Sequence, residues 1–355
     1  MTSESIDQAG KIAPAVLERV IKPHRGARRP EVLVGPRHGV DVGIVDLGGD
    51  QVMALTTDPF FIMPEYGWER AAWFAVHIVA SDAATSGLRP AYCAVDLNLP
   101  HEMADEDLAA MWDAADAACS EIGMAIVTGH TGRYDGCSFP MLGAATVVCV
   151  GPTERYVTPQ MARVGDAVVL TKGAAIEATA QLAVTFPGRI ASVYGQELAR
   201  RAADLFWQMS VVRDCLTAVE IGVRDHGVTA MHDATERGVW GGLREIADAS
   251  GVGMLVHEGA IPVRPEVRAV CDLFGIDPFS ASSEGTLLLT VRPHRVTDLI
   301  DRLHAAGIPA ARVGEIVPPE QGVKVVSGGS EHDLEIPLFD PFWPAFRRAM
   351  EEAER

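Results

Sequence analysis

Apolar and polar residues alternate along the chain with two periods, and each period indicates a different kind of element. Alternation every second residue, or a short apolar run, is typical of strands, whereas apolar spacing of i, i+3, i+4 and i+7 is typical of helices. In the first half, the Gly48-Gly49-Asp50 turn predicts a hairpin. The expected elements are a helix at 12–21, hairpin strands at 40–47 and 51–57, helices at 68–86 and 105–123, a short buried strand at 124–128 and a strand at 141–150.

The second half continues the interleaving of strands and helices after a stretch rich in turn-forming residues, 151–159, which we interpret as a linker. We therefore predict an α/β domain at 1–155 and an α+β domain at 160–345. The expected strands of the second domain are 167–171, 228–231, 253–257, 286–291, 310–316 and 323–326. Its expected helices are 175–184, a long region at 196–225, one ending near 250, 265–273 and 294–306.

Composition narrows the possible partners. The 355 residues include 30 Lys and Arg against 48 Asp and Glu, so the net charge is −18, and no basic stripe is available for nucleic acid or an anionic membrane. We find no apolar run long enough to span a membrane and no apolar signal-peptide core near the N-terminus. The six cysteines are scattered, which is typical of a reduced cytoplasmic protein. An acidic protein that binds a phosphorylated ligand needs a metal cation to do so.

Three aspartates are candidates for such a cation. If the hairpin loop is Gly49-Asp50, paired residues have numbers that sum to 99, and Asp41 lies directly opposite Asp58. Like charges in that arrangement repel, unless a divalent cation such as Mg²⁺ binds both carboxylates. Asp82 lies in an otherwise apolar predicted helix. The alternative, that these aspartates are solvated surface residues, stays open on this evidence alone.

Four further motifs combine glycines with polar side chains at predicted strand ends. Segment 129–133, Gly-His-Thr-Gly-Arg, ends a strand, and segment 232–238, His-Asp-Ala-Thr-Glu-Arg-Gly, leads into a helix; both could approach phosphate. Segment 172–177 begins with Lys172 and ends with Glu177, and segment 280–285 carries Glu284, a possible general base. Each motif alone is also compatible with an ordinary turn or helix cap. The chain contains no P-loop and no dinucleotide fingerprint.

The order of these motifs is more informative than any one of them. Taken together, they resemble the aminoimidazole ribonucleotide (AIR) synthase-like, or PurM-like, superfamily, and in particular its hydrogenase maturation branch. That branch is indicated by Lys11, by segment 172–177 and by Ser283-Glu284-Gly285. The complete ordered set is Gly10-Lys11, Gly39-Val40-Asp41, Thr57-Asp58, the segment 81–90, Gly129-His130-Thr131, Gly165-Asp166, the segment 233–238 and Ser283-Glu284-Gly285.

The resemblance implies a two-domain AIR synthase-like fold whose N-terminal domain dimerises through a shared β-barrel. It also implies ATP and Mg²⁺ as cofactors and γ-phosphoryl transfer to a small-molecule oxygen. Glu284 and Arg133 are our candidates for proton transfer and substrate contact. The implied metal ligands are Asp41, Asp58, Asp82 and Asp233; the implied nucleotide-binding residues are these four with Lys11, Gly129, His130, Thr131, Lys172 and Glu177.

Three departures from the family pattern leave alternatives open. Val40 and His130 stand where the family usually has acidic residues, and no cysteine follows Cys271. The tail chemistry of the hydrogenase maturation branch, which uses a C-terminal cysteine, is therefore not expected. We predict an ATP- and Mg²⁺-dependent ligase, cyclase, dehydratase or kinase acting on a small molecule as a homodimer. The alternatives are a nucleotide-binding regulatory or assembly protein without turnover, and a kinase of the thiamine-monophosphate type.

Overall fold

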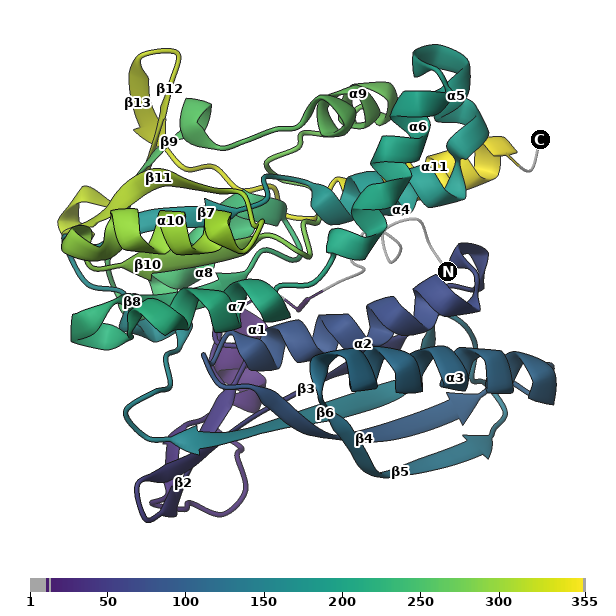
Figure 1. Cartoon of the computed structure of the whole chain (residues 1–355), viewed down its shortest axis with the longest axis horizontal. Coiled ribbons are helices and arrows are strands. Elements are labelled where there is room, and N and C mark those ends of the chain that lie inside the picture. Colours follow the sequence, from purple (N-terminus) through teal and green to yellow (C-terminus); the bar gives the residue numbers. More distant parts are fainter. Residues whose placement is uncertain (1–10, 13, 354–355) are drawn as a thin grey trace. The chain divides into compact units, whose positions relative to one another are not determined.

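The computed structural model describes residues 11, 12 and 14–353, which fold into two compact units (Figure 1). The N-terminal unit comprises 29–35 and 41–156. The C-terminal unit comprises 157 onward, together with the described residues up to Arg28 and the short segment Pro36–Val40. Gly10, part of one family motif, lies outside the described residues.

A six-stranded sheet with helices on one face forms the N-terminal unit. The strands lie in the order β1-β2-β3-β6-β4-β5, and Figure 1 shows α2 and α3 packed along the same side of them. Most of the elements of this unit agree with those predicted from the periodicity of the first half of the sequence. Their bounds are β1 Val32–Val34, β2 Gly43–Gly48, β3 Gln51–Phe61, α2 Trp68–Ala84, β4 Pro90–Leu99, α3 Asp105–Ile122, β5 Ala125–Arg133 and β6 Met141–Pro152.

Strand β4 is central to this sheet, yet the sequence analysis assigned no element to it. Its side chains alternate strictly, with Cys93, Val95, Leu97 and Leu99 buried and the residues between them less so. This alternation is the signature of a strand with one covered face. The alternation is present in the sequence itself, in a strand that begins at Pro90, the last residue of the 81–90 motif.

The predicted pairing of Asp41 with Asp58 is wrong. Partners across the β2–β3 ladder have numbers that sum to 98, as in Gly43 with Leu55, because the ladder is irregular between Asp46 and Gly48. Asp41 precedes the first residue of β2, and Asp58 pairs instead with Ala145 on β6. A one-residue slip moves side chains to the other face of a sheet, so an expectation built on register alone was sensitive to this irregularity.

Strand β5 also differs from the prediction. It begins at Ala125 and ends at Arg133, so the Gly129-His130-Thr131 motif lies inside the strand and not at its end. The strand occupies the edge of the sheet, where it pairs in parallel only with β4. Most of its residues are exposed, contrary to the expected short buried strand. Edge position explains the exposure, because one side of the strand lacks a neighbour.

The C-terminal unit contains a seven-stranded sheet in the order β13-β12-β9-β11-β7-β10-β8. The strands are β7 Ala167–Thr171, β8 Val228–Asp233, β9 Gly253–His257, β10 Leu287–Val291, β11 Ala310–Val317, β12 Val323–Ser327 and β13 Ser330–Asp333. Every residue of β7, β8 and β10 is buried, which explains why β7 and β10 are almost entirely apolar. The core includes Leu170, Leu243, Ile246 and Leu288, where α8 packs on the sheet.

Helices account for the rest of the C-terminal unit. They are α4 Ile176–Thr185, α5 Pro187–Tyr194, α6 Gln196–Asp204, α7 Val212–Ala218, α8 Gly238–Ser250, α9 Pro265–Phe274, α10 Val296–Ala305 and α11 Phe342–Ala353, with a short helical stretch from Pro14 to Ile21. The long helix expected at 196–225 is broken, since α6 ends at Asp204 and α7 begins at Val212. Between them, the carbonyls of Gln208 and Ser210 accept hydrogen bonds from Lys172. Among the described residues, none of the helices is long and apolar enough to cross a bilayer.

Candidate active site

Three strand ends of the C-terminal unit meet at one edge of its sheet. Strands β7 and β8 each pair antiparallel with β10, so β7 and β8 run in the same direction. Their last residues, Thr171 and Asp233, therefore lie beside the first residue of β10, Leu287. This topology brings Lys172, Asp233 and Glu284 to the same end of the sheet, although they are far apart in sequence.

Glu177 joins this group through a backbone contact. Its Oε2 accepts a hydrogen bond from the backbone N–H of Glu284 at 3.0 Å, and its Oε1 accepts one from Gln181 at 3.0 Å. Both contacts are buried, and Glu177 lies in the first turn of α4. The side chain of Glu284 is itself only 1% exposed. Glu177 therefore holds the backbone of the candidate base in a fixed position.

Burial also changes the acidity of Glu177. Removal from water raises the pKa of its carboxyl group to about 8, because the charged form loses hydration. The N–H of Glu284 acts in the opposite direction, whereas the negative charges of Asp340 and Glu236 raise the pKa further. Glu177 consequently keeps its proton at neutral pH. Asp340 is affected similarly, since burial raises its pKa despite hydrogen bonds from Phe342, Arg237 and Ser282.

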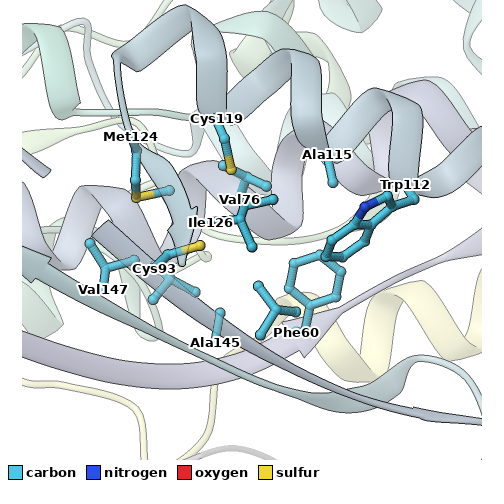
Figure 2. A pocket seen from close by; sticks show the side chains of 12 residues that line it. Phe60, Val76, Cys93, Trp112, Ala115, Cys119, Met124, Ile126, Ala145 and Val147 are labelled. Carbon is cyan, nitrogen blue, oxygen red and sulfur yellow. The ribbon is translucent and has the colours of Figure 1, made fainter. Parts of the chain in front are cut away.

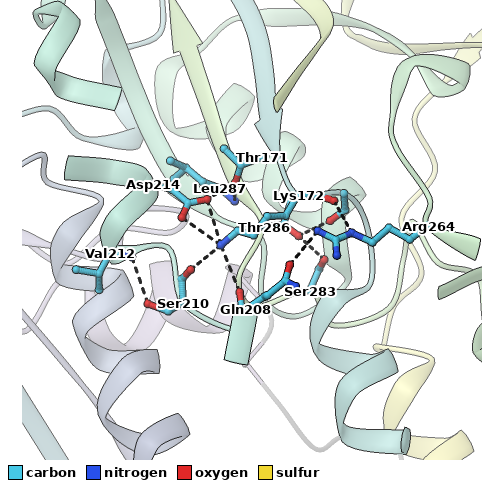
Figure 3. A network of polar contacts seen from close by, with 11 residues as sticks. Thr171, Lys172, Gln208, Ser210, Val212, Asp214, Arg264, Ser283, Thr286 and Leu287 are labelled. Atoms are coloured by element: carbon cyan, nitrogen blue, oxygen red, sulfur yellow. Dashed lines mark hydrogen bonds and ion pairs between the residues drawn. The ribbon is translucent and has the colours of Figure 1, made fainter. Parts of the chain in front are cut away.

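Lys172 is the centre of a buried polar network (Figure 3). Its Nζ donates to Asp214 Oδ2 at 3.1 Å and to the carbonyl oxygens of Ser210 at 2.6 Å and Gln208 at 3.3 Å. An ammonium group has three donors, and these contacts use all of them. Thr171 donates to the other oxygen of Asp214 at 2.6 Å. A lysine held in this way ties the end of β7 to α7.

His232 and Asp233 end β8, and both are only 1% exposed. The Nε2 of His232 lies 2.8 Å from Glu245 Oε2 on α8, while its Nδ1 lies 3.7 Å from Asp233 Oδ1. The second oxygen of Glu245 accepts a hydrogen bond from Arg237 at 3.0 Å. The ring is thus fixed between two carboxylates.

Glu245 is ionised in this environment. Burial alone would raise its pKa, but the positive charge of Lys11 and the hydrogen bond and charge of His232 outweigh burial and hold that pKa below its usual value. Lys11 lies 3.9 Å from Glu245, and its backbone N–H donates to Glu236 at 2.8 Å. The predicted nucleotide residue Lys11 is therefore placed beside the motif that contains Asp233.

The N-terminal unit holds the other predicted carboxylates. Thr56 on β3 donates to Asp82 Oδ2 on α2 at 3.3 Å, so Asp82 faces the sheet. Asp58 lies two residues beyond Thr56 and therefore on the same, helix-covered face of β3. The structure thus brings Asp58 and Asp82 to one layer of the unit. Asp41 lies in the segment that precedes β2.

Residues of segment 129–133 on β5 make contacts that stabilise the N-terminal unit. A Cβ on Gly129 would lie 2.2 Å from the carbonyl oxygen of Val95, so glycine is required for β5 to approach β4. The Nε2 of His130 lies 2.6 Å from the hydroxyl of Tyr134, and the two rings stack. Arg133 donates to Asp105 at the start of α3, at 2.6 Å. These contacts hold the motif in place on the edge strand.

A small cavity in the N-terminal unit is not a ligand site. It lies between the helices and the sheet and is lined by apolar and sulfur-containing side chains, among them Phe60, Val95, Trp112 and Met124 (Figure 2). Its volume is about 10 Å³, which is roughly the space of one water molecule. A cavity of this size and lining is a packing defect of the core.

Comparisons with known proteins agree with this architecture. Residues 39–151 match the N-terminal domain of AIR synthase related proteins, and residues 163–326 match their C-terminal domain. The chain belongs to the AIR synthase-related family. Within it, the chain lies in the HypE branch. Carbamoyl dehydratase HypE of Azotobacter vinelandii is 30% identical over 277 residues, which make up 76% of each of the two proteins.

Solved structures share the fold of this AIR synthase-related chain. The hydrogenase maturation protein HypE in complex with ATP superimposes with a TM-score of 0.67 and 22% identity, covering 96% of this chain and 98% of that one. ThiL complexed with AMPPCP and TMP gives a TM-score of 0.69 and 18% identity, covering 95% and 98%. These likenesses establish the two-domain α/β and α+β fold that the motifs predicted.

The sequence analysis missed several residues of this site. His232 was quoted only as part of a turn, and Asp214 and Glu245 were not singled out. Asp214 lies within the region expected to be one helix, where a lone carboxylate carries no signal. Glu245 follows His232 by 13 positions, and only the packing of α8 on the sheet brings the two together. A buried charge at an apolar helix face was the one available clue.

Proposed function

We propose that this AIR synthase-related protein is an enzyme that uses ATP and Mg²⁺ to phosphorylate, and so activate, an oxygen of a small substrate. The proposal depends on one observation above all: Glu284, Glu177, Asp233 and Lys172 meet at one end of the C-terminal sheet. Membership of the HypE branch supports the proposal, because one relative is named a carbamoyl dehydratase. Two proteins of similar fold were solved with ATP or with its analogue AMPPCP, which also supports it.

The proposed metal ligands fit Mg²⁺ by their chemistry. Carboxylate oxygens are the donors that this ion prefers, and we propose Asp41, Asp58, Asp82 and Asp233 for this role. Thr56 orients Asp82, and Asp58 shares the same face of β3. When bound, Mg²⁺ neutralises phosphate charge and so makes the γ-phosphoryl group easier to transfer.

The chain's own residues orient the reactants and move a proton. We propose that Glu284 takes the proton from the substrate oxygen, with Glu177 holding its backbone N–H. Arg133 exchanges its contact with Asp105 for one with the substrate or phosphate, to which a guanidinium can donate two hydrogen bonds. The proposed nucleotide-binding residues are Lys11, Gly129, His130, Thr131, Lys172 and Glu177. Lys172 would have to release one of its three acceptors to make that contact.

The test is ATP binding and turnover by the Asp58→Asn variant. We expect the variant to fold and to lose most of its Mg²⁺-dependent ATP affinity in calorimetry, at least tenfold, because it loses a charged ligand. The matched control is Asp113→Asn, which changes an exposed aspartate on α3 of the same unit. Unchanged ATP affinity in Asp58→Asn would contradict the assignment of Asp58 as a metal ligand. If the wild type releases no ADP in the presence of Mg²⁺ and candidate substrates, the proposal that the protein is an enzyme is contradicted.

Two alternatives have an observation in their favour. The likeness to ThiL favours a kinase, which would leave a stable phosphorylated product and not release phosphate. The replacements at Val40 and His130 favour a nucleotide-binding regulatory or assembly protein, which would bind ATP tightly without releasing ADP. Product analysis by phosphorus NMR separates all three.

We also propose that the protein works as a cytoplasmic homodimer. Met53, Leu55, Val148, Val150 and Tyr92 share the face of the N-terminal sheet opposite to α2 and α3. Tyr92 is 48% and Val150 is 43% exposed, and apolar side chains grouped on one exposed face are typical of an interaction surface. A second copy of this face is the proposed partner, as the family resemblance implies. All six cysteines are free, which supports a reducing compartment.

A further inference from the structure

We propose that Arg264 binds an oxyanion, a phosphate or carboxylate group, of the small substrate, and that this substrate is therefore an anion. The proposal rests on the proposed function in placing the substrate at the end of the C-terminal sheet where Glu284 lies. It goes further in naming the chemical class of the substrate and a residue that selects it. Arg264 directly precedes Pro265, the first residue of α9.

Arg264 belongs to the polar network at the ends of β7 and β10 (Figure 3). Its Nε donates to the backbone carbonyl of Lys172 at 3.3 Å, and its Nη2 donates to Oε1 of Gln208 at 2.9 Å. The backbone of Gln208 packs in turn on the segment that carries Glu284, because a Cβ on Gly285 would lie only 2.2 Å from the carbonyl oxygen of Gln208. The guanidinium is therefore anchored beside the proposed base, within the C-terminal unit.

The charge of Arg264 has no counter-ion among its contacts. Both of its acceptors are neutral oxygens, and it forms no ion pair with any residue that the structure describes. The ammonium group of Lys172, by contrast, contacts Asp214 and is balanced by it. Partial burial lowers the pKa of Arg264, against a smaller opposite effect of Glu266. A half-buried cation that has only neutral acceptors is stabilised when an anion binds to it.

The guanidinium also keeps donors for a ligand. It carries five N–H groups in a planar fork, and the contacts with Lys172 and Gln208 use two of them. The remaining donors include both N–H groups of Nη1. Such a fork binds two oxygens of a phosphate or carboxylate group through parallel hydrogen bonds. Because the two existing contacts already hold the side chain in place, little rotational freedom is left to lose on binding.

The surroundings explain why an anionic substrate needs this residue. The chain has a net charge of −18, and Asp233 and Glu284 lie at the same end of the sheet as Arg264. Carboxylates repel an oxyanion that approaches them, unless a cation binds it. Arg264 supplies that cation. It holds the substrate by a group other than the oxygen that receives the phosphoryl group.

Modification by phenylglyoxal, which reacts with arginine side chains, tests the proposal in the nucleotide-free, full-length protein. Peptide mass spectrometry follows Arg264 and, as the control, Arg268, an exposed arginine on the same helix. Inorganic phosphate at about ten times its dissociation constant should slow the modification of Arg264 about tenfold relative to chloride of equal ionic strength, because occupied sites do not react. Arg268 should react at the same rate in both salts. Acetate replaces phosphate in a second series, and the anion that protects at lower concentration identifies the class of oxyanion.

Equilibrium dialysis with ³²P-labelled phosphate measures the affinity of the variants. Arg264→Gln should weaken phosphate binding at least about tenfold, because it removes charge-assisted hydrogen bonds. Arg264→Lys should weaken it less, since an ammonium group keeps the charge and loses the fork. Arg268→Gln is the matched control and should bind phosphate as the wild type does. A parallel sample contains Mg²⁺ and a non-hydrolysable ATP analogue, and phosphate should still protect Arg264 there.

Equal modification of Arg264 in phosphate, acetate and chloride would overturn the proposal, as would unchanged phosphate affinity in a folded Arg264→Gln variant. Protection by the ATP analogue, with no further effect of phosphate, would assign Arg264 to the nucleotide and overturn it too. If Arg264→Gln does not fold, the modification of the wild type decides. Failure here is distinct from failure of the proposed function. Protection of Arg264 in a protein that releases no ADP contradicts only the enzyme, whereas ADP release without protection contradicts only the role of Arg264.

Discussion

At the scale of single residues, burial decides which charged groups keep their usual chemistry. Glu177 is buried and keeps its proton at neutral pH, whereas Glu245 is buried and ionised, because Lys11, His232 and Arg237 surround it with positive charge and donors. Two glutamates of one unit therefore have opposite states. Neither state follows from the residue type; each follows from its neighbours.

The pKa of Glu177 predicts how stability depends on pH. Folding raises this pKa from its ordinary value of 4.5 to about 8, so between these values the native state holds a proton that the unfolded state has released. Stability from this group is complete below about pH 4.5 and is lost as pH rises to 8. Glu177→Gln removes the effect. The difference in free energy of unfolding, variant minus wild type, should therefore rise by about 1.4 kcal/mol per pH unit in that window.

Denaturant unfolding at several pH values measures this difference. The control is Glu121→Gln, an exposed glutamate at the end of α3. For it, the difference from wild type should stay constant with pH. A difference for Glu177→Gln that is equally constant from pH 5 to 8 would show that the native carboxyl group is ionised.

A second prediction at this scale concerns the buried pair of Lys172 and Asp214. Both side chains are less than a tenth exposed. Removing one partner from such a pair leaves the other charge buried, which costs about 3–5 kcal/mol. Lys172→Met should therefore lower the free energy of unfolding by that amount, measured by chemical denaturation.

The chain offers a matched control for this pair. Lys324 and Asp333 form an ion pair at 2.7 Å, but Asp333 is 79% exposed. Lys324→Met should cost no more than about 1 kcal/mol, because water hydrates the remaining charge. A loss for Lys172→Met as small as the one expected for Lys324→Met would mean that Lys172 does not stabilise the fold, and would strengthen its assignment to the nucleotide.

At the scale of elements, periodicity predicted those with one buried face, and tertiary contacts determined the others. Helix α2 was expected near its observed bounds, because its apolar side chains recur at helical spacing. The region 196–225 also has helical spacing, but it divides into α6 and α7, and the carbonyl oxygens of Gln208 and Ser210 between them accept hydrogen bonds from Lys172. Strand β5 looks buried by its sequence and is exposed because of its place at the edge of the sheet.

The close approach of β5 to β4 gives a prediction for this element. Gly129→Ala places a Cβ at 2.2 Å from the carbonyl oxygen of Val95, so the strands must separate. We expect a loss of about 1–3 kcal/mol in the free energy of unfolding, measured by denaturant titration. Gly188→Ala on α5 is the control, since its Cβ would meet nothing within 4 Å. An unchanged free energy of unfolding in Gly129→Ala would contradict this prediction and would favour a role for Gly129 in ligand binding alone.

At the scale of the whole molecule, the exposed face of the N-terminal sheet is the feature that predicts assembly. Tyr92→Asp places a charge in the middle of this face, and we expect the variant to be a monomer in light scattering while the wild type is a dimer. Tyr194→Asp is the control, because Tyr194 is 39% exposed on α5 of the other unit. A wild type that is monomeric at micromolar concentration would contradict the proposed dimer.

The sequence by itself determined the family, the fold class and most elements, because ordered motifs and local periodicity survive without knowledge of tertiary contacts. It also identified Glu177, Asp233 and Glu284 as polar residues at strand and helix ends. Only the tertiary structure decided what these residues touch. Strands β7 and β8 run in the same direction on either side of β10, which gathers these residues at one end of the three strands. The packing of α8 brings Glu245 to His232. Pairing across long sequence separations depends on the whole chain, so no local pattern could have supplied it.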